Sequence, residues 1–244
     1  MATYFISDLH LQPNRPELSH ALIWLMAEQG SQMDTLYILG DLFDAWIGDD
    51  YENAFIDNIK QLLKMASEAG TEVFLMPGNR DFLIGQDFAR QTGCQLLSDP
   101  AVIDLYGAKV LLMHGDLLCT QDVDYQKFRL MVRNQQWQQQ LLEKSLPERL
   151  DIAQQLRSMS QKKTGSKEYE IMDIHQPEVE SRMLSDQVQM LIHGHTHRPA
   201  VHNLALKGLP ATRVVLGDWG KELWYLRVDE TGHELKRKPI PDTP

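Results

Sequence analysis

The stretch Thr3–His10 reads TYFISDLH, an apolar run that ends in a carboxylate and an imidazole. Short runs rich in β-branched and aromatic residues predict buried strands. The same pattern recurs at Thr35–Leu39 and Thr71–Met76, and helix-like stretches lie between these runs at Glu17–Gln29 and Ala54–Ala69. Strands and helices that alternate at this spacing predict an α/β fold with mainly parallel strands joined by helical crossovers.

The second half of the chain adds strands with shorter connections. Val102–Leu105 and Lys109–Met113 are separated by three residues that include Gly107, which predicts a hairpin. Four further strands are expected, at Gln189–His193, Val201–Leu206, Arg213–Leu216 and Leu223–Val228. We therefore predict one domain over residues 1–244, a layered β-sandwich flanked by helices.

Residues 121–168 interrupt this rhythm. They contain no strand pattern, are rich in Gln, and predict two or three helices interrupted at Pro147 and Gly165. Nine basic and six acidic side chains give the segment a net charge of +3, whereas the whole chain carries −10. We interpret the segment as a helical insertion; the alternative is an amphipathic helix pair that only packs on the core. Its candidate apolar contacts are Trp137, Leu141, Leu142 and Leu146.

The composition excludes several classes of protein. With 244 residues, of which 43% are hydrophobic, the chain can bury a substantial core and is not disordered. A net charge of −10 argues against nucleic-acid binding, so a phosphate ligand would need a metal ion or a local basic patch. The two cysteines, Cys94 and Cys119, are expected to be free thiols. No apolar run approaches the ~20 residues that span a bilayer and no signal peptide is recognisable, so we expect a cytoplasmic protein.

Polar clusters follow five of the predicted strands, at the point where each strand ends. The clusters are Asp8-Leu9-His10, Gly40-Asp41, Gly78-Asn79-Arg80-Asp81, His114-Gly115-Asp116 and Gly194-His195-Thr196-His197. Parallel α/β sheets gather their ligand sites at the carboxyl ends of the strands, so we expect these side chains to converge. Four clusters contain a glycine, which lets the backbone turn sharply beside a bound ion.

Seven side chains of these clusters are candidate metal ligands: Asp8, His10, Asp41, Asn79, His114, His195 and His197. Carboxylate and amide oxygens mixed with imidazole nitrogens, without a thiolate, suit Mn²⁺, Fe²⁺ or Zn²⁺. Seven donors are too many for one ion with open positions, but they fit two ions that share a carboxylate. Two ions ~3.5–4 Å apart can activate water and hold a phosphoryl group during an in-line displacement.

In this order, the clusters resemble the motifs of the calcineurin-like metallophosphoesterases. Within that family the chain is similar to the branch that acts on a diacylated UDP-glucosamine in the lipid A synthesis of Gram-negative bacteria. The resemblance covers nearly the full length, and Arg80 is typical of this branch, since many other members have His there. It is carried by Tyr37–Phe43 (YILGDLF), Trp46–Asp50 (WIGDD), Gly78–Leu83 (GNRDFL) and Leu191–Ala200 (LIHGHTHRPA).

The resemblance implies two Mn²⁺ ions per chain and assigns their ligands. One ion would be held by Asp8, His10, Asp41 and His197, and the other by Asp41, Asn79, His114 and His195, so that Asp41 bridges them. Water activated between the ions would attack the α-phosphorus of UDP-2,3-diacylglucosamine, giving UMP and 2,3-diacylglucosamine 1-phosphate. The catalytic residues would be Asn79, Arg80, His114 and His195. Because arginine does not accept a proton at its pKa, Arg80 would stabilise phosphate charge; the alternative is a surface arginine paired with Asp81.

The resemblance also implies how the substrate is bound. The binding residues would be Asn79, Arg80, Asp122, Ser160, Thr164, Lys167 and His195, although Ser160 and Thr164 could equally be helix caps. An apolar groove between the insertion and the core would take the acyl chains, and the basic insertion would favour an anionic membrane surface. The protein would then lie on the cytoplasmic face of the inner membrane, with no nucleic-acid partner and no obligate protein partner.

Two other functions stay open at this point: a soluble phosphodiesterase or nucleotide pyrophosphatase with the same metals, and a non-catalytic scaffold. Deleting residues 121–168 should spare small-ester hydrolysis and abolish the lipid reaction if the leading hypothesis holds. His193 is expected in the core, and Asp116 is a candidate to support the ligands from behind. Asp44, Asp49 and Asp50 are expected either to order the loop after Asp41 or to form hydrogen bonds to the metal ligands, while Asp218 has no assigned role.

Overall fold

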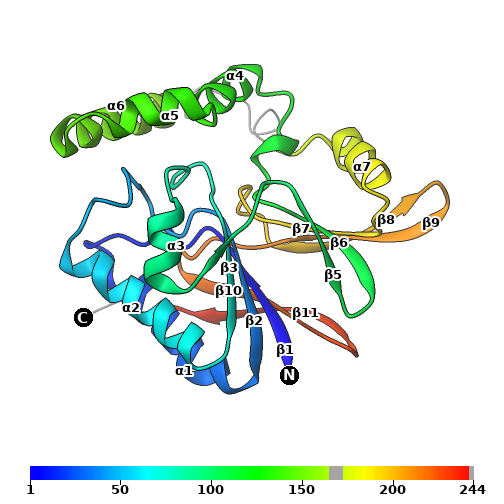
Figure 1. Ribbon diagram of the computed structural model, residues 1–244. Coiled ribbons are helices and arrows are strands. Elements are labelled where there is room, and N and C mark those ends of the chain that lie inside the picture. Colours follow the sequence, from blue (N-terminus) through cyan, green and yellow to red (C-terminus); the bar gives the residue numbers. More distant parts are fainter. Residues whose placement is uncertain (165–172, 242–244) are drawn as a thin grey trace.

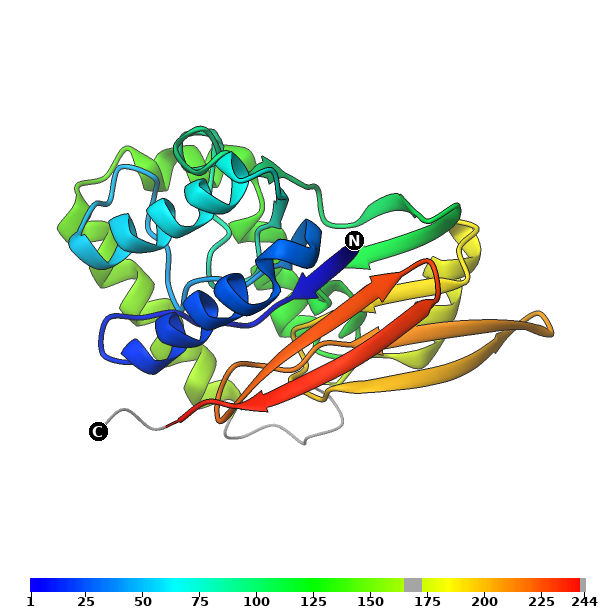
Figure 2. The same cartoon turned by 90° about the horizontal axis from the view of Figure 1, so that it is seen from below.

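The computed structural model describes residues 1–164 and 173–241, and for residues 159–164 it describes the backbone alone. Two β-sheets pack face to face, and helices cover their outer faces (Figure 1, Figure 2). The predicted layered β-sandwich flanked by helices is therefore confirmed.

The first sheet has the strand order β11-β10-β1-β2-β3-β4. Its parallel strands are β1 (Ala2–Ile6), β2 (Met33–Leu39), β3 (Glu72–Met76) and β4 (Gln95–Leu96). β10 (Glu222–Asp229) and β11 (Gly232–Pro239) extend it with antiparallel pairing. Three helices cover its outer face: α1 (Pro16–Gln29), α2 (Ala54–Glu68) and α3 (Gln86–Thr92).

The second sheet has the strand order β5-β6-β7-β9-β8. β6 (Ala108–Met113), β7 (Met190–His193) and β9 (Leu209–Val215) are parallel, and β5 (Ala101–Leu105) and β8 (Ala200–Leu206) are antiparallel edges. α7 (Gln176–Ser185) packs against the outer face of this sheet through Val179 and Met183.

An apolar core between the two sheets holds them together. It contains Phe5 and Leu39 from the first sheet and Leu112, Ile192 and Val214 from the second, all fully buried. Removing such side chains from water is the main stabilising contribution in a sandwich of this kind. The carboxyl ends of β1, β2, β3, β6 and β7 consequently meet at one edge of the molecule (Figure 1).

The segment predicted as an insertion forms helices across that edge (Figure 1). They are α4 (Val123–Val132), α5 (Gln135–Leu142) and α6 (Leu146–Thr164). Pro147 lies in the first turn of α6, where its missing N–H costs nothing, and Gly165 lies outside the described residues. Leu141 is buried in the core and Trp137 packs against the ring of Phe82, but Leu142 is 42% exposed, so its expected core contact is wrong.

Four elements were not predicted: α3, β4, α7 and β11. β11 is an edge strand whose alternating side chains are mostly polar, so it lacks the apolar face by which strands are recognised. In α7 only Val179 and Met183 are buried, which is too few to set a helical period. β9 begins at Leu209, four residues before the predicted Arg213, because it pairs with β8 across a tight turn.

Candidate metal centre

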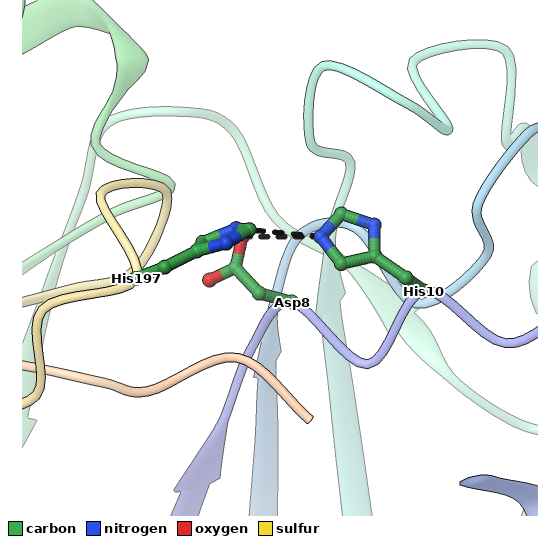
Figure 3. Close-up of side chains that lie close together, drawn as sticks. All are labelled: Asp8, His10 and His197. Carbon is green, nitrogen blue, oxygen red and sulfur yellow. Dashed lines mark hydrogen bonds and ion pairs between the residues drawn. The ribbon is translucent and has the colours of Figure 1, made fainter. Parts of the chain in front are cut away.

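The first set of predicted ligands lies together at the ends of β1 and β7. The Nε2 atom of His197 is 3.3 Å from Oδ1 of Asp8 and 3.4 Å from Nε2 of His10, and His10 Nε2 is 4.0 Å from Asp8 Oδ1. Figure 3 shows the three side chains pointing toward one another. A single cation at this position would contact all three donors, whose mutual distances suit a shared ion.

The second set lies on the neighbouring loops after β2, β3, β6 and β7. Asn79 Oδ1 is 2.8 Å from Nε2 of His114 and 2.9 Å from Nδ1 of His195, and His114 Nε2 is 3.8 Å from Oδ1 of Asp41. These four donors are the ones expected for the other ion.

Asp41 lies between the two sets. Its Oδ1 faces His114, whereas its Oδ2 is 4.0 Å from Nε2 of His10. One carboxylate oxygen is therefore directed at each set, which is the arrangement that a bridging ligand requires. All seven side chains predicted as ligands are brought together by the fold.

The ligand loops adopt a backbone conformation that sequence patterns do not show. Five ligands have positive φ angles in the left-handed region: Asp8 (55°), His10 (48°), Asp41 (55°), His195 (69°) and His197 (56°). Only a few per cent of non-glycine residues adopt such angles, and they concentrate at functional sites. The strain is concentrated where the side chains converge, which indicates that the fold is built around this centre.

Two glycines leave room for the ligand carboxylates. A Cβ atom on Gly78 would overlap with Oδ1 and the backbone nitrogen of Asp41, and a Cβ on Gly194 would overlap with Oδ2 of Asp8. The glycines of these motifs therefore admit the neighbouring ligand side chain. We had expected them to permit sharp turns, and a positive φ of 92° at Gly40 does require this as well.

Hydrogen bonds to other atoms of the ligand side chains orient their metal-binding atoms. Asp8 Oδ2 accepts hydrogen bonds from Ser7 Oγ (2.6 Å) and from the backbone N–H of His195 (2.9 Å). Nδ1 of His114 donates to the carbonyl oxygen of Leu39 (2.9 Å), which leaves the Nε2 lone pair directed at the site. Oδ1 of Asp8 is buried and has no hydrogen-bond partner among the described residues. An unsatisfied buried carboxylate oxygen amid imidazoles fits a cation ligand, so the residues present suit a divalent metal.

The pKa values of the predicted ligands are consistent with a site that releases protons when it binds metal ions. Burial, reinforced by Asp81 and Asp8, raises the pKa of Asp41 to about 7. Burial lowers the pKa of His10 to about 3 and of His195 to about 4, so both imidazoles are neutral and able to bind metal. Although burial opposes it, the charges of Asp41, Asp116 and Asp8 raise the pKa of His114 to about 9. A bound cation would displace the protons held by Asp41 and His114.

Arg80 faces a cavity next to this centre. Its backbone N–H donates to Asp41 Oδ1 (2.8 Å), and its side chain lines the cavity together with Asn79. Asp81 is fully buried and accepts hydrogen bonds from the backbone N–H groups of Gly78 (2.7 Å) and Asp41 (3.2 Å). The alternative of a surface ion pair between Arg80 and Asp81 is therefore wrong.

The cavity lies between the predicted insertion and the core. Its volume of about 160 Å³ exceeds the ~10–15 Å³ that one water needs, so it can admit a ligand group. Asn79, itself a predicted ligand, and Arg80 line it, and its other polar lining residues are Asp44, Asp122, Asp124, Tyr125, Arg149 and Arg157. Its apolar lining residues include Trp46, Ile47, Phe82, Leu83, Phe128, Leu141, Ile152 and Leu156. The expected apolar groove is therefore present.

The remaining predicted substrate residues fare differently. Asp122 lines the cavity but also caps α4, because its Oδ1 accepts a hydrogen bond from the backbone N–H of Tyr125 (3.0 Å). Ser160 and Thr164 lie at the end of α6, in residues 159–164, of which only the backbone is described, and Lys167 lies outside the described residues altogether. The structure tests none of these three.

The contacts of several residues at the site were not predicted from the sequence. Asp44 pairs with Arg157, and Asp50 pairs with Arg149, so these carboxylates attach the loop after Asp41 to α6. The opposite charges of the two segments were visible in the sequence, but nothing there indicated which residues meet. Tyr125 was also missed, and its ring lies 5.8 Å from that of His195.

The other side chains singled out in the sequence are now placed. His193 is fully buried and bonded to the Gly194 carbonyl, as expected for a core residue. Asp49 orders the start of α3 by accepting hydrogen bonds from the backbone N–H groups of Gly85 and Phe88. Oδ2 of Asp218 lies 3.8 Å from Nδ1 of His197, at the exposed rim.

Comparison with known proteins gives matches over the whole chain. Residues 1–199 match the model of the calcineurin-like phosphoesterase family. A UDP-2,3-diacylglucosamine hydrolase of Marinobacter nauticus is 46% identical over 99% of this chain and 100% of its own length. The hydrolases of that name from Pseudomonas aeruginosa and Azotobacter vinelandii are 47% and 48% identical, over 99% and 98% of this chain and 100% of theirs.

Among solved structures, a novel archaeal phosphodiesterase has a TM-score of 0.49 and 12% identity, covering 98% of this chain and 100% of its own. The similarity to the three hydrolases extends through residues 121–168, because it spans nearly the full length of both partners.

Proposed function

The chain belongs to the calcineurin-like phosphoesterase family, and we propose that it hydrolyses the diphosphate bond of UDP-2,3-diacylglucosamine in lipid A biosynthesis. The products are UMP and 2,3-diacylglucosamine 1-phosphate. The observation that carries this proposal is the cavity next to the predicted metal ligands, which is lined by both charged and apolar side chains. A substrate with a diphosphate and two acyl chains needs both.

We propose two Mn²⁺ ions as the resident cofactors, with Asp41 shared between them. The donors of each set are the ones named for the two sets above, and their carboxylate and amide oxygens and imidazole nitrogens suit manganese. When bound, two divalent cations would make water more acidic and would offset the charge that builds up on the phosphoryl oxygens.

The protein's own groups are proposed to orient the phosphate. Arg80 is positioned beside Asn79 to meet the phosphate oxygens as a permanent cation. Asn79, His114 and His195 form one hydrogen-bonded cluster, so a change in any one of them displaces the others. Asp122, Ser160, Thr164 and Lys167 are proposed to bind the sugar and phosphate groups, which Asp122 supports by lining the cavity.

We further propose that residues 121–168 form a lid that contacts the cytoplasmic face of the inner membrane. Among the described residues, no helix is both long and apolar enough to cross a bilayer. Four exposed apolar side chains lie on α4 and α5, namely Val123, Leu130, Met131 and Leu142. Together with the net charge of +3 of the segment, they suit an anionic lipid surface.

The proposal is tested by turnover of synthetic UDP-2,3-diacylglucosamine. Protein stripped of metal should be inactive, and manganese should restore the release of UMP. In water labelled with ¹⁸O, the label should enter UMP, since the attacked atom is the α-phosphorus. If UDP-glucose were cleaved as fast as the diacylated substrate, the proposed substrate would be wrong.

A pair of variants tests the apolar side of the cavity. Leu156→Trp fills the space that is proposed to hold acyl chains, so it should raise KM for the diacylated substrate at least tenfold. The matched control is Leu150→Trp, on the exposed side of the same helix. With the substrate dissolved in detergent, this variant should leave the KM for the diacylated substrate unchanged. Equal effects of the two variants would count against an acyl site in this cavity.

A further inference from the structure

The first helix of the insertion, α4, is joined to the metal-ligand loops by a buried arginine. Arg129 is 8% exposed, and its Nη2 lies 2.8 Å from Oδ2 of Asp99 while its Nε lies 2.9 Å from Oδ2 of Asp116. Both carboxylates are buried as well, Asp116 completely. One guanidinium on α4 is therefore paired with two buried carboxylates.

Both carboxylates are associated with the loop that carries the predicted metal ligand His114. Oδ1 of Asp99 accepts a hydrogen bond from the backbone N–H of His114 (3.2 Å), and Asp116 follows His114 by two residues in the same loop. Without Arg129 the two carboxylates would be buried without the guanidinium that contacts both of them, which is unfavourable. We expect the loop that carries His114 to shift in response.

Two further residues at α4 contact the other loops of the same ligand set. Nη2 of Arg133, at the end of the helix, donates to the carbonyl oxygens of Pro77 (2.8 Å) and Gly78 (3.0 Å), immediately before Asn79. The hydroxyl of Tyr125 donates to Asp116 Oδ2 (2.8 Å), and its ring packs near His195. α4 therefore reaches the loops of Asn79, His114 and His195.

The loops of the other ligand set are held by hydrogen bonds to neighbouring loops instead. The backbone N–H of Trp219 donates to the carbonyl of Asp8 (3.0 Å), and the N–H of His10 donates to the carbonyl of Asp41 (3.0 Å). These bonds hold Asp8 and His10 without help from α4.

We propose that Arg129 is a positioning residue for the cation held by Asn79, His114 and His195, and that α4 is part of the metal centre. The inference rests on the proposed function only in taking two divalent cations as resident; it does not depend on the identity of the lipid substrate. It also changes the expectation for deleting residues 121–168. Removing α4 would leave Asp99 and Asp116 without their cation, so small-ester hydrolysis should fall together with the lipid reaction.

The direct test is manganese binding to the full-length, metal-stripped protein, followed by calorimetry and by electron paramagnetic resonance. Wild type should bind two ions. Arg129→Met should lose about 10–100-fold in affinity for one ion, the range typical of residues that orient metal ligands, and keep the other. The matched control is Lys127→Met, which removes a positive charge from the exposed side of the same helix and should keep both ions at wild-type affinity.

A second variant keeps the proposal testable if Arg129→Met does not fold. Arg129→Lys retains the charge but not the fork that reaches both carboxylates, so it should weaken the same ion by less. Hydrolysis of bis(p-nitrophenyl) phosphate, which has no acyl chain, should fall in the same order. Wild-type affinity for both ions in the folded Arg129 variants would overturn the inference, and so would equal weakening of both ions. Failure of wild type to cleave the diacylated substrate would overturn the proposed function instead.

Discussion

Replacing Asp41 by Asn should stabilise the metal-free protein while weakening its response to metal. Asp41 is 2% exposed, and its pKa is raised to about 7, chiefly by burial and further by Asp81 and Asp8. In the unfolded chain the same carboxyl ionises near its ordinary value of 3.8. Above pH 7 the metal-free fold therefore holds a carboxylate where a neutral group would be more stable.

The magnitude follows from the shift in pKa. A change from 3.8 to about 7 is about three units, and each unit is worth about 1.4 kcal/mol, so the penalty is on the order of 4 kcal/mol above pH 7. Because the folded pKa is the higher one, stability is fully present below pH 3.8 and is lost as the pH rises through 7. The amide does not ionise, and its Oδ1 can still accept the N–H of Arg80, which is 2.8 Å away in the wild type. The amide also removes the charge that raises the pKa of His114, which offsets part of this gain, so the variant should be more stable than the wild type at pH 8 and have a smaller advantage at pH 5.

Urea denaturation of chelator-treated proteins at pH 5 and pH 8 measures this difference. Asp104→Asn, at an exposed hairpin, is the control and should change the free energy of unfolding by less than about 0.5 kcal/mol. Manganese at 100 times its Kd should add about 2.7 kcal/mol per ion to the wild type and less to the Asp41 variant. The reasoning is refuted if the variant is no more stable than the wild type at pH 8 without metal.

Three further predictions concern other parts of the chain. Gly78→Ala places a Cβ against Asp41, so metal content should fall and turnover should drop about 100-fold, as measured by elemental analysis and UMP release; unchanged turnover would contradict the close approach. Arg149→Met removes a hydrogen bond to a core carbonyl and an ion pair at the cavity wall; we expect a higher KM for the diacylated substrate and a lower Tm, with small-ester hydrolysis unchanged. Burial raises the thiol pKa to about 11 for Cys94 and about 12 for Cys119, so neither should react with iodoacetamide at pH 8 until urea is added, and rapid labelling of native protein would be the contrary result. For the same reason the two thiols should add no pH dependence to the stability below about pH 9, and their contribution should fall as the pH rises toward 11, since the unfolded thiols ionise first.

Much of the fold was predictable because its signals are local. An apolar run such as Thr3–Ser7 is recognisable as a strand from its own residues, and the polar cluster after it marks where the strand ends. β11 was missed because its partner, β10, supplies the hydrogen bonds that make it a strand, while its own side chains are mostly polar. Such an element exists only in the context of its neighbour.

The candidate site, too, was predictable from the sequence only in part. The chemical character of the donors and their positions after five strands were readable in the chain, since residue type and strand order are properties of the sequence. The tertiary structure alone decided that Asp41 turns one oxygen toward each ligand set and that five ligands adopt left-handed angles. It also decided that Arg129 meets Asp99 and Asp116, and that Arg149 meets Asp50. These partners lie 13 to 99 residues apart in the sequence. Which charged side chains meet depends on how the sheets and helices pack, and no periodic pattern in the sequence records that packing.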